Sequence, residues 1–129
     1  MPTEDLWGDL PDGEDIRTPK TILKEQADLL IQKTDGILEG RVLTRPVDEF
    51  MRHILQIVVP SLNNYTVNIL SVTQSIYGYP CYLDDFIEKG EDVYKINDEK
   101  NLMESLKHHL QSEGIQRLIK SLMAEAKAS

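Results

Sequence analysis

Cysteine is nearly absent from this chain of 129 residues, because Cys81 is the only one. No disulfide can therefore form within the chain. A structural zinc site needs four ligands, usually cysteines or histidines at short spacing, and the three histidines offer no such spacing. His108 and His109 are adjacent, so on a helix their side chains would point about 100° apart. The sequence predicts no metal site, and we expect both of these histidines at the surface or rim of a domain.

Glycine clusters and long apolar runs are missing as well. Phosphate-binding loops need several glycines where a strand meets a helix, whereas the seven glycines here are scattered along the chain. No apolar run approaches the ~18 residues that a membrane span needs. The first residues are acidic and have neither the basic nor the apolar region of a signal peptide. We therefore expect no cofactor, no membrane insertion and a cytoplasmic location.

Positive charge is also scarce. The net charge is −8, and residues 1–16 hold six acids and no base. Binding to nucleic acid would require a concentrated basic face, but the basic residues are spread singly along the sequence, so we expect no nucleic-acid partner. The leading segment has too few apolar side chains to offset its chain entropy. We predict that residues 1–17 form a flexible acidic arm and that residues 18–129 form a single domain.

The clearest predicted element is a helix from about Pro19 to Thr34. Thr18 is a good N-cap, and Pro19 suits the first helical position because its missing N–H costs nothing there. Apolar residues then recur at three- and four-residue steps, which is typical of an amphipathic helix. Gly36 can take the left-handed conformation that often ends a helix.

Alternating apolar and polar residues predict the strands that follow. The two strongest runs, 50–59 and 65–73, flank a short turn and predict an antiparallel hairpin. Within the second run, strict alternation places Ile69 on the face opposite to Leu70 and Val72. Weaker strands are predicted at 37–44, 81–83 and 93–96, with a connection at 45–49 and an acidic loop at 84–92.

Helical periodicity returns near Asn97 or Asp98, is interrupted at residues 112–114, and then resumes, with residues 124–129 expected to fray. Segregated strands and helices indicate an α+β fold. The prediction is an N-terminal helix, a three- to four-stranded, mostly antiparallel sheet, and two C-terminal helices (or one kinked helix) packed on one sheet face.

Two residues, His53 and Cys81, are candidates for a catalytic role. His53 lies on the apolar side of its strand, and a carboxylate such as Glu39 or Asp48 on a neighbouring strand would make it a general-base candidate. A partly buried, hydrogen-bonded histidine is the favoured interpretation. A nucleophilic cysteine needs a lowered pKa, and the surroundings of Cys81 in sequence offer no cause for one, so we expect a packing residue.

The strongest candidates for binding are exposed apolar and aromatic side chains. In the arm, the i, i+1, i+4 spacing of Leu6, Trp7 and Leu10 would place them on one side of a helical turn, as in a short linear motif. A second group is rich in tyrosine, a residue enriched at protein interfaces. It consists of Tyr77, Tyr79, Tyr82 and Phe86.

These observations favour a protein-binding module rather than an enzyme. An inhibitor, immunity or antitoxin-like role against a basic protein is one concrete version, since the acidic charge would steer such a partner. One alternative is a small-molecule-binding protein or small enzyme with a pocket between sheet and helices, for which His53, Arg52, Arg41 and the tyrosines would be the candidate residues. Another is a self-associating domain, for example a homodimer.

Overall fold

The computed structural model describes residues 3–88 and 93–129 and confirms the predicted α+β class. One helix precedes the sheet and two follow it, with five strands in the described part of the chain against the three or four predicted. In chain order the elements are α1 (Pro19–Lys33), β1 (Glu39–Val47), β2 (Phe50–Val59), the short 3-10 helix η1 (Pro60–Leu62), β3 (Tyr65–Gln74), β4 (Cys81–Asp85), β5 (Tyr94–Ile96), α2 (Glu99–Leu110) and α3 (Glu113–Ala128).

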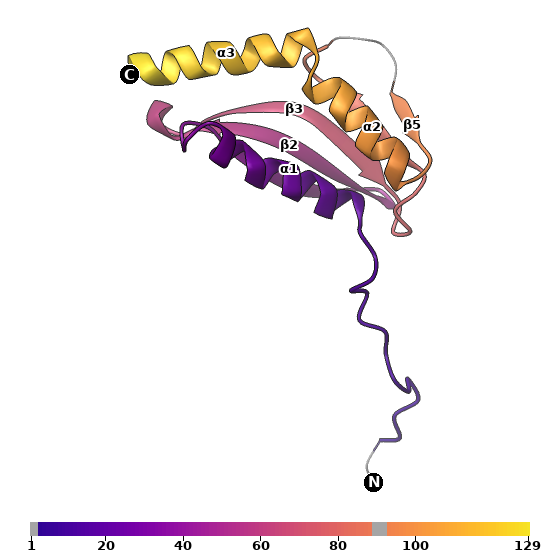
Figure 1. The fold of residues 1–129 in the computed structure, drawn as a ribbon. Helices are drawn as coiled ribbons and strands as arrows, with labels where there is room; N and C mark the ends of the chain where they lie inside the picture. Colours follow the sequence, from indigo (N-terminus) through magenta and orange to yellow (C-terminus); the bar gives the residue numbers. More distant parts are fainter. Residues whose placement is uncertain (1–2, 89–92) are drawn as a thin grey trace.

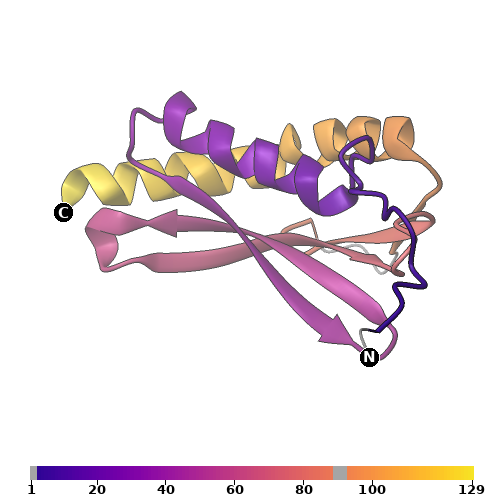
Figure 2. The same cartoon turned by 90° about the horizontal axis from the view of Figure 1, so that it is seen from below.

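The sheet is an antiparallel meander in which each strand pairs with the next one in sequence. All three helices cover the same face, as Figures 1 and 2 show, while the other face carries no helix among the described residues. We call these the covered face and the open face. A layer of helices on one side of a sheet buries one apolar set of strand residues and leaves the alternate set in contact with solvent.

Each helix begins at a side chain that caps its first N–H groups. Thr18 accepts from the N–H of Thr21, as expected from the sequence. Ser112 accepts from the N–H of Ile115, so the predicted interruption separates two helices. The predicted fraying of residues 124–129 is wrong, because α3 continues to Ala128 and Ala126 is buried in the core. Packing of that last turn stabilises residues that helix propensity alone would leave frayed.

The predicted connection at 45–49 is mostly strand. β1 continues to Val47, and only Asp48 and Glu49 separate it from β2. Pro46, which suggested a break, pairs with Met51 and is tolerated because β1 lies at the edge of the sheet. A two-residue turn therefore replaces the longer connection, with Asp48 at a φ of 53°.

A bulge in β3 overturns the predicted alternation of that strand. Leu55 pairs with Leu70 and the next residue, Gln56, pairs with Asn68, so Ile69 is an extra residue opposite β2. An extra residue reverses the facing of all residues beyond it. Leu70 and Val72 therefore lie on the covered face, fully buried, rather than on the open face.

The predicted acidic loop at 84–92 is also partly wrong. Asp84 and Asp85 belong to β4, where Asp85 is buried at 6% exposure. Residues 89–92 of that predicted loop lie outside the described residues.

No helix in the described ranges has the length and apolar character required to cross a bilayer.

Candidate functional site: a groove between the helices

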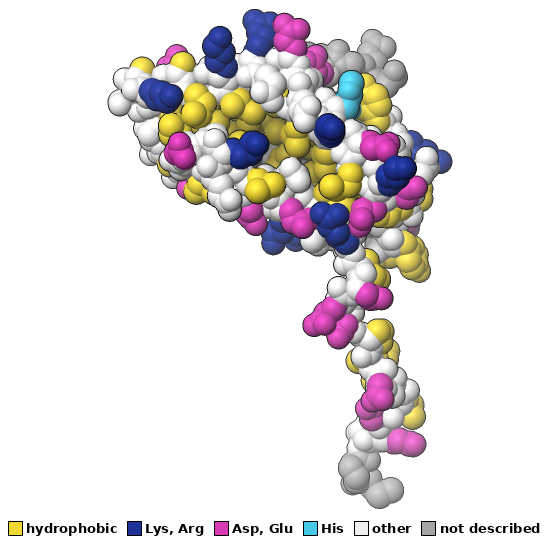
Figure 3. All heavy atoms as spheres, in the orientation of Figure 1, with side chains coloured by type: hydrophobic (Ala, Val, Ile, Leu, Met, Phe, Trp, Pro, Cys, Tyr) yellow, Lys and Arg dark blue, Asp and Glu magenta, His cyan; other side chains and the backbone are white. Residues whose placement is uncertain are grey.

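A groove of about 680 Å³ runs between α1 on one side and α2 and α3 on the other. In Figure 3 it appears as a hollow of apolar atoms surrounded by charged and polar side chains. Such a volume lies within the range of about 300–1,000 Å³ that is typical of binding pockets. The hollow is open to solvent along the surface between the helices, so a chain segment or an elongated molecule can enter it from the side.

The groove exists because the helices pack on different parts of the covered face. α1 contacts mainly β1 and approaches it closely at Gly40, where a Cβ atom would overlap the backbone of Ala27. α2 contacts β5, and α3 contacts η1 at the far end of the β2–β3 hairpin. Between these contacts the side chains of β2 and β3 form the floor of the groove, where they are nearly buried, at 1–4% exposure.

The floor and walls are aliphatic. Leu55 and Ile57 of β2 and Ile69 of β3 form the floor, and the β3 bulge supplies the last of these. Apolar side chains of the helices form the walls. They are Leu29 and Leu30 of α1, Met103, Leu106 and Leu110 of α2, and Ile115 and Ile119 of α3.

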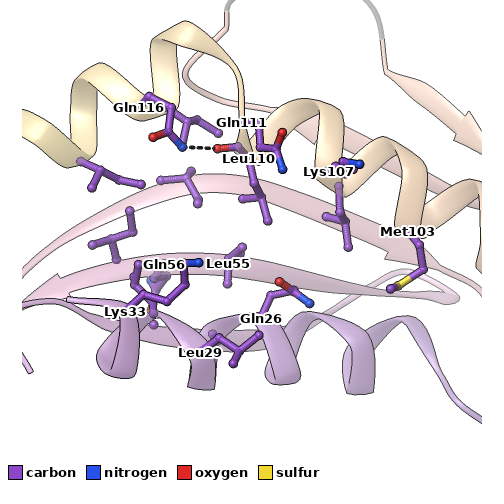
Figure 4. Close-up of a pocket in the computed structure, with 18 of the residues that line it drawn as sticks. Gln26, Leu29, Lys33, Leu55, Gln56, Met103, Lys107, Leu110, Gln111 and Gln116 are labelled. Atoms are coloured by element: carbon purple, nitrogen blue, oxygen red, sulfur yellow. Dashed lines mark hydrogen bonds between the residues drawn. The ribbon is translucent and has the colours of Figure 1, made fainter. Parts of the chain in front are cut away.

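Polar side chains of the helices lie on the rim, as Figure 4 shows, and Gln56 of β2 also lines the groove. Gln26 and Lys33 come from α1, and Lys107 and Gln111 come from α2. The amide of Gln116 donates to the carbonyl oxygen of Leu110 at 2.9 Å and satisfies the end of α2. The lining includes two lysines and one glutamate, a net charge of +1 in a chain of net charge −8.

His53 does not meet a carboxylate. The hydroxyl of Thr44 lies 2.9 Å from its Nδ1, and Gln74 Oε1 lies 2.9 Å from its Nε2. Burial lowers the pKa of this imidazole. A neutral ring that donates from Nε2 to Gln74 and accepts at Nδ1 from Thr44 satisfies both contacts. The geometry fits the predicted hydrogen-bonded structural histidine, and the general-base pairing with Glu39 or Asp48 is not present.

The prediction of a surface position for His109 is wrong. Its side chain is buried, and Nδ1 lies 2.7 Å from Asp85 Oδ2. The other carboxylate oxygen of Asp85 accepts from the N–H groups of Ile87 and Glu88, each at 2.9 Å. This buried cluster joins α2 to the end of β4 and supports the wall of the groove.

A sequence signal for this pair existed. Asp85 continues the alternation of Cys81 and Leu83, and His109 follows Leu102 and Leu106 at helical spacing. Both patterns place the polar residue on a buried face, but the charged residues that surround them in sequence favour a solvated loop and a solvated helix end.

Burial also raises the pKa values of Cys81 and Tyr79. Burial raises the pKa of the Cys81 thiol to about 12, which keeps it protonated, as expected for a packing residue. Burial, and then the proximity of Cys81 and Glu99, raises the pKa of Tyr79 to about 12. The Tyr79 hydroxyl has no hydrogen-bond partner in the described part of the chain, and its ring packs against the core.

The predicted tyrosine-rich group does not form one surface. Tyr77 lies in the β3–β4 connection and is 90% exposed, whereas Tyr79 is partly buried. Tyr82 lies opposite Thr73 on the open face, and Phe86 follows the far end of β4. The four residues therefore occupy separate positions around the sheet.

The three apolar residues of the arm are strongly exposed. Leu6, Trp7 and Leu10 have exposures of 85%, 79% and 67%. Hydrogen bonds described for residues 3–16 join near neighbours only, such as the Trp7 N–H to Asp5 and the Ile16 N–H to Gly13. The arm runs away from the helices in Figure 1.

An arginine cluster on the open face was missed by the sequence analysis. Strand register brings Arg45 directly opposite Arg52, and Arg41 lies on the same face two residues from Leu43. In the described residues their one recorded side-chain bond runs from Arg52 to Thr73 at 3.4 Å. Arg45 and Arg52 are seven residues apart in sequence and lie directly opposite each other across the hairpin, a pairing that the predicted connection at 45–49 concealed.

Within the residues that the structure describes, no group of three or more potential metal ligands comes together. No family model, curated protein or solved structure matches the chain.

Proposed function

We propose that this chain is a protein-binding module and that the groove between α1 and α2–α3 holds an apolar segment of its partner. The observation that carries the proposal is the apolar lining of the groove, in which Leu29 and Met103 are 43% and 38% exposed above the buried floor of Leu55, Ile57 and Ile69. Apolar area of this kind is stabilised when another molecule removes it from water. A helix or extended segment with apolar residues at regular spacing would fill such a groove.

The rim favours a segment whose apolar residues have acidic neighbours. Lys33 and Lys107 stand on opposite walls of the groove, so they can approach carboxylates on both sides of a bound segment. The overall charge of −8 predicts attraction for a basic protein. The local positive charge of the groove favours an acidic segment instead. Contacts within a few ångströms outweigh the screened field of more distant charges.

Photo-crosslinking in native cells tests the proposal. A photoreactive residue replaces Leu29, which lines the groove and is 43% exposed, or Phe50, which lies on the open face and is 41% exposed. The proposal predicts a protein adduct at position 29 through an apolar, acid-flanked peptide, and its loss when Leu110→Glu is added. Adducts at position 50 alone, or none at 29, would contradict the proposal.

A second candidate function is the binding of a mostly apolar small molecule, favoured by the groove volume of about 680 Å³. The two lysines of the rim would then hold an anionic group. Native mass spectrometry of the purified chain separates this candidate from the first. A bound small molecule that leaves on denaturation, together with no protein adduct at position 29, would support ligand binding.

A further inference from the structure

The N-terminal arm has the chemistry that the groove requires. Leu6, Trp7 and Leu10 are apolar and exposed, and they stand among acidic residues. Those residues are Glu4, Asp5, Asp9, Asp12, Glu14 and Asp15. The groove offers an aliphatic floor and a lysine on each wall. One molecule thus carries an exposed apolar segment with acidic neighbours and an apolar groove with a net positive lining. The charge of the segment is opposite in sign to that of the groove.

We propose that the groove of one copy of this chain binds Leu6, Trp7 and Leu10 of a second copy, so that two copies exchange arms. The inference rests on the proposed function, because it names the partner of that same groove. Reciprocal exchange gives a closed twofold dimer with two identical arm–groove contacts.

The size of the arm suits the groove. On a helical turn, Leu6 and Leu10 lie about 6 Å apart along the axis. The groove extends along α1 from Gln26 to Lys33, which is about 10 Å of helix. The seven Cα–Cα steps from Leu10 to Arg17 can span about 23 Å when extended. The anchors can therefore sit in a neighbouring groove while the rest of the arm bridges the two copies.

The direction of the arm favours a second copy over the groove of the same chain. Arg17 fixes the base of the arm by ion pairs to Glu25 of α1 and Glu99 of α2. From this point the arm runs away from both helices (Figure 1), and all its residues from 3 to 16 are exposed. Entry into its own groove would require the chain to reverse directly after Ile16.

The open face is a poorer site for the arm. Its apolar side chains, among them Leu43, Ile54 and Phe50, lie beside the arginines Arg41, Arg45 and Arg52, so they offer no continuous apolar floor for a tryptophan. The arginines can attract the acidic residues of the arm, but the anchors Leu6, Trp7 and Leu10 would stay in contact with water there. The groove satisfies both the charge and the apolar side chains.

Mass and fluorescence of the full chain test arm exchange together. Trp7 is the only tryptophan, so its emission reports directly on the anchor. We expect a concentration-dependent dimer by sedimentation equilibrium and a blue shift of Trp7 emission as the dimer forms. Leu10→Ala in the arm and Leu29→Glu in the groove should each weaken the dimer by about tenfold or more, because each removes a buried apolar contact. Tyr77→Ala, which removes an exposed aromatic residue elsewhere, is the matched control.

A mixing experiment identifies the exchange itself. Trp7→Ala with Leu10→Ala removes the anchors, and Leu29→Glu damages the groove, so each variant alone should dimerise at least about tenfold more weakly than the unaltered chain. The mixture should form a heterodimer, since the first variant keeps an intact groove and the second keeps an intact arm. Its emission should be blue-shifted, because the Trp7 that remains is then bound.

Three results would overturn the inference. A monomer with blue-shifted Trp7 emission would place the arm in its own groove, and a monomer with solvent-like emission would leave the arm unbound. A dimer that neither the arm variants nor the groove variant weakens would use another surface. In each case a protein adduct at position 29 to a different chain would leave the proposed function standing, so the two failures are distinguishable.

Discussion

Large apolar side chains contact solvent on both sides of the sheet, but they are arranged differently. On the helix side, Leu29 of α1 is 43% exposed at the edge of a concave, aliphatic groove. On the open face, Phe50 is 41% exposed on a surface where arginines separate the apolar residues. Interspersed charge limits the contiguous apolar area that a partner can bury. Exposure of single residues therefore does not identify a binding surface, whereas shape and continuity do.

The largest difference between the faces is expected in stability, at two adjacent aspartates of β4. Asp85→Ala removes the partner of buried His109 and the acceptor for two N–H groups, so unfolding should require about 3–5 kcal/mol less free energy. Asp84→Ala, on the open face, should change it by less than about 0.5 kcal/mol. Urea unfolding of the two variants measures both values. Equal losses would contradict the assignment of Asp85 to a buried structural cluster.

The next difference concerns binding. Leu29→Glu places a negative charge at the groove and should weaken binding of an acidic apolar segment by about tenfold or more, whereas Phe50→Glu should leave it unchanged. The two residues have nearly equal exposure, which makes them a matched pair. The affinity of the arm for the groove is measured by following Trp7 emission as the concentration of each variant is raised. Equal weakening by both variants would show that negative charge alone, rather than the groove, accounts for the loss.

A smaller effect concerns the pH dependence of stability, through His53 on the covered face. Because burial lowers the folded-state pKa of His53 below its usual value of 6.5, the unfolded chain binds a proton before the folded chain does. Stability should therefore fall as the pH drops below about 6.5, and this loss should level off below the folded-state pKa. Urea midpoints across this range should change less steeply for His53→Gln than for the exposed control His108→Gln. Identical slopes would contradict the role assigned to burial.

The smallest effect is expected on the open face, where Arg45 and Arg52 stand directly opposite each other on neighbouring strands. Like charges in this position destabilise a sheet, so Arg45→Glu should raise the free energy of unfolding by roughly 0.2–1 kcal/mol. Arg45→Gln, which removes the repulsion without adding attraction, should give a smaller gain. A loss of stability in both variants would indicate that Arg45 has a favourable contact on this face.

Local sequence patterns predicted most of the fold. The cap at Thr18, the interruption at residues 112–114, the strong alternation of residues 50–59 and the order of helices and strands are all local features, and the structure contains them. The errors arose where tertiary packing decides the outcome. A single extra residue at Ile69 reverses the faces of Leu70 and Val72, and alternation alone does not reveal it.

The candidate groove was less predictable. Its lining comes from α1, two strands and two further helices, so no stretch of sequence contains it. A pocket between sheet and helices was predicted as an alternative, with His53, Arg52, Arg41 and the tyrosines as candidates, and none of these residues lines the groove. By contrast, the arm anchors Leu6, Trp7 and Leu10 were identified from local spacing alone, and their role as a binding segment stays a prediction.

The most direct test of the account is a methyl NMR titration that distinguishes the two faces. The chain with Trp7→Ala and Leu10→Ala, labelled at isoleucine and leucine methyl groups, receives an unlabelled peptide of residues 3–16. The account predicts shifts at the groove residues Leu30, Leu110 and Ile119, and none at Leu43 and Ile54 of the open face. Shifts at Leu43 and Ile54 instead, or no shift at any methyl group, would contradict the central claim that the groove binds an acidic apolar segment.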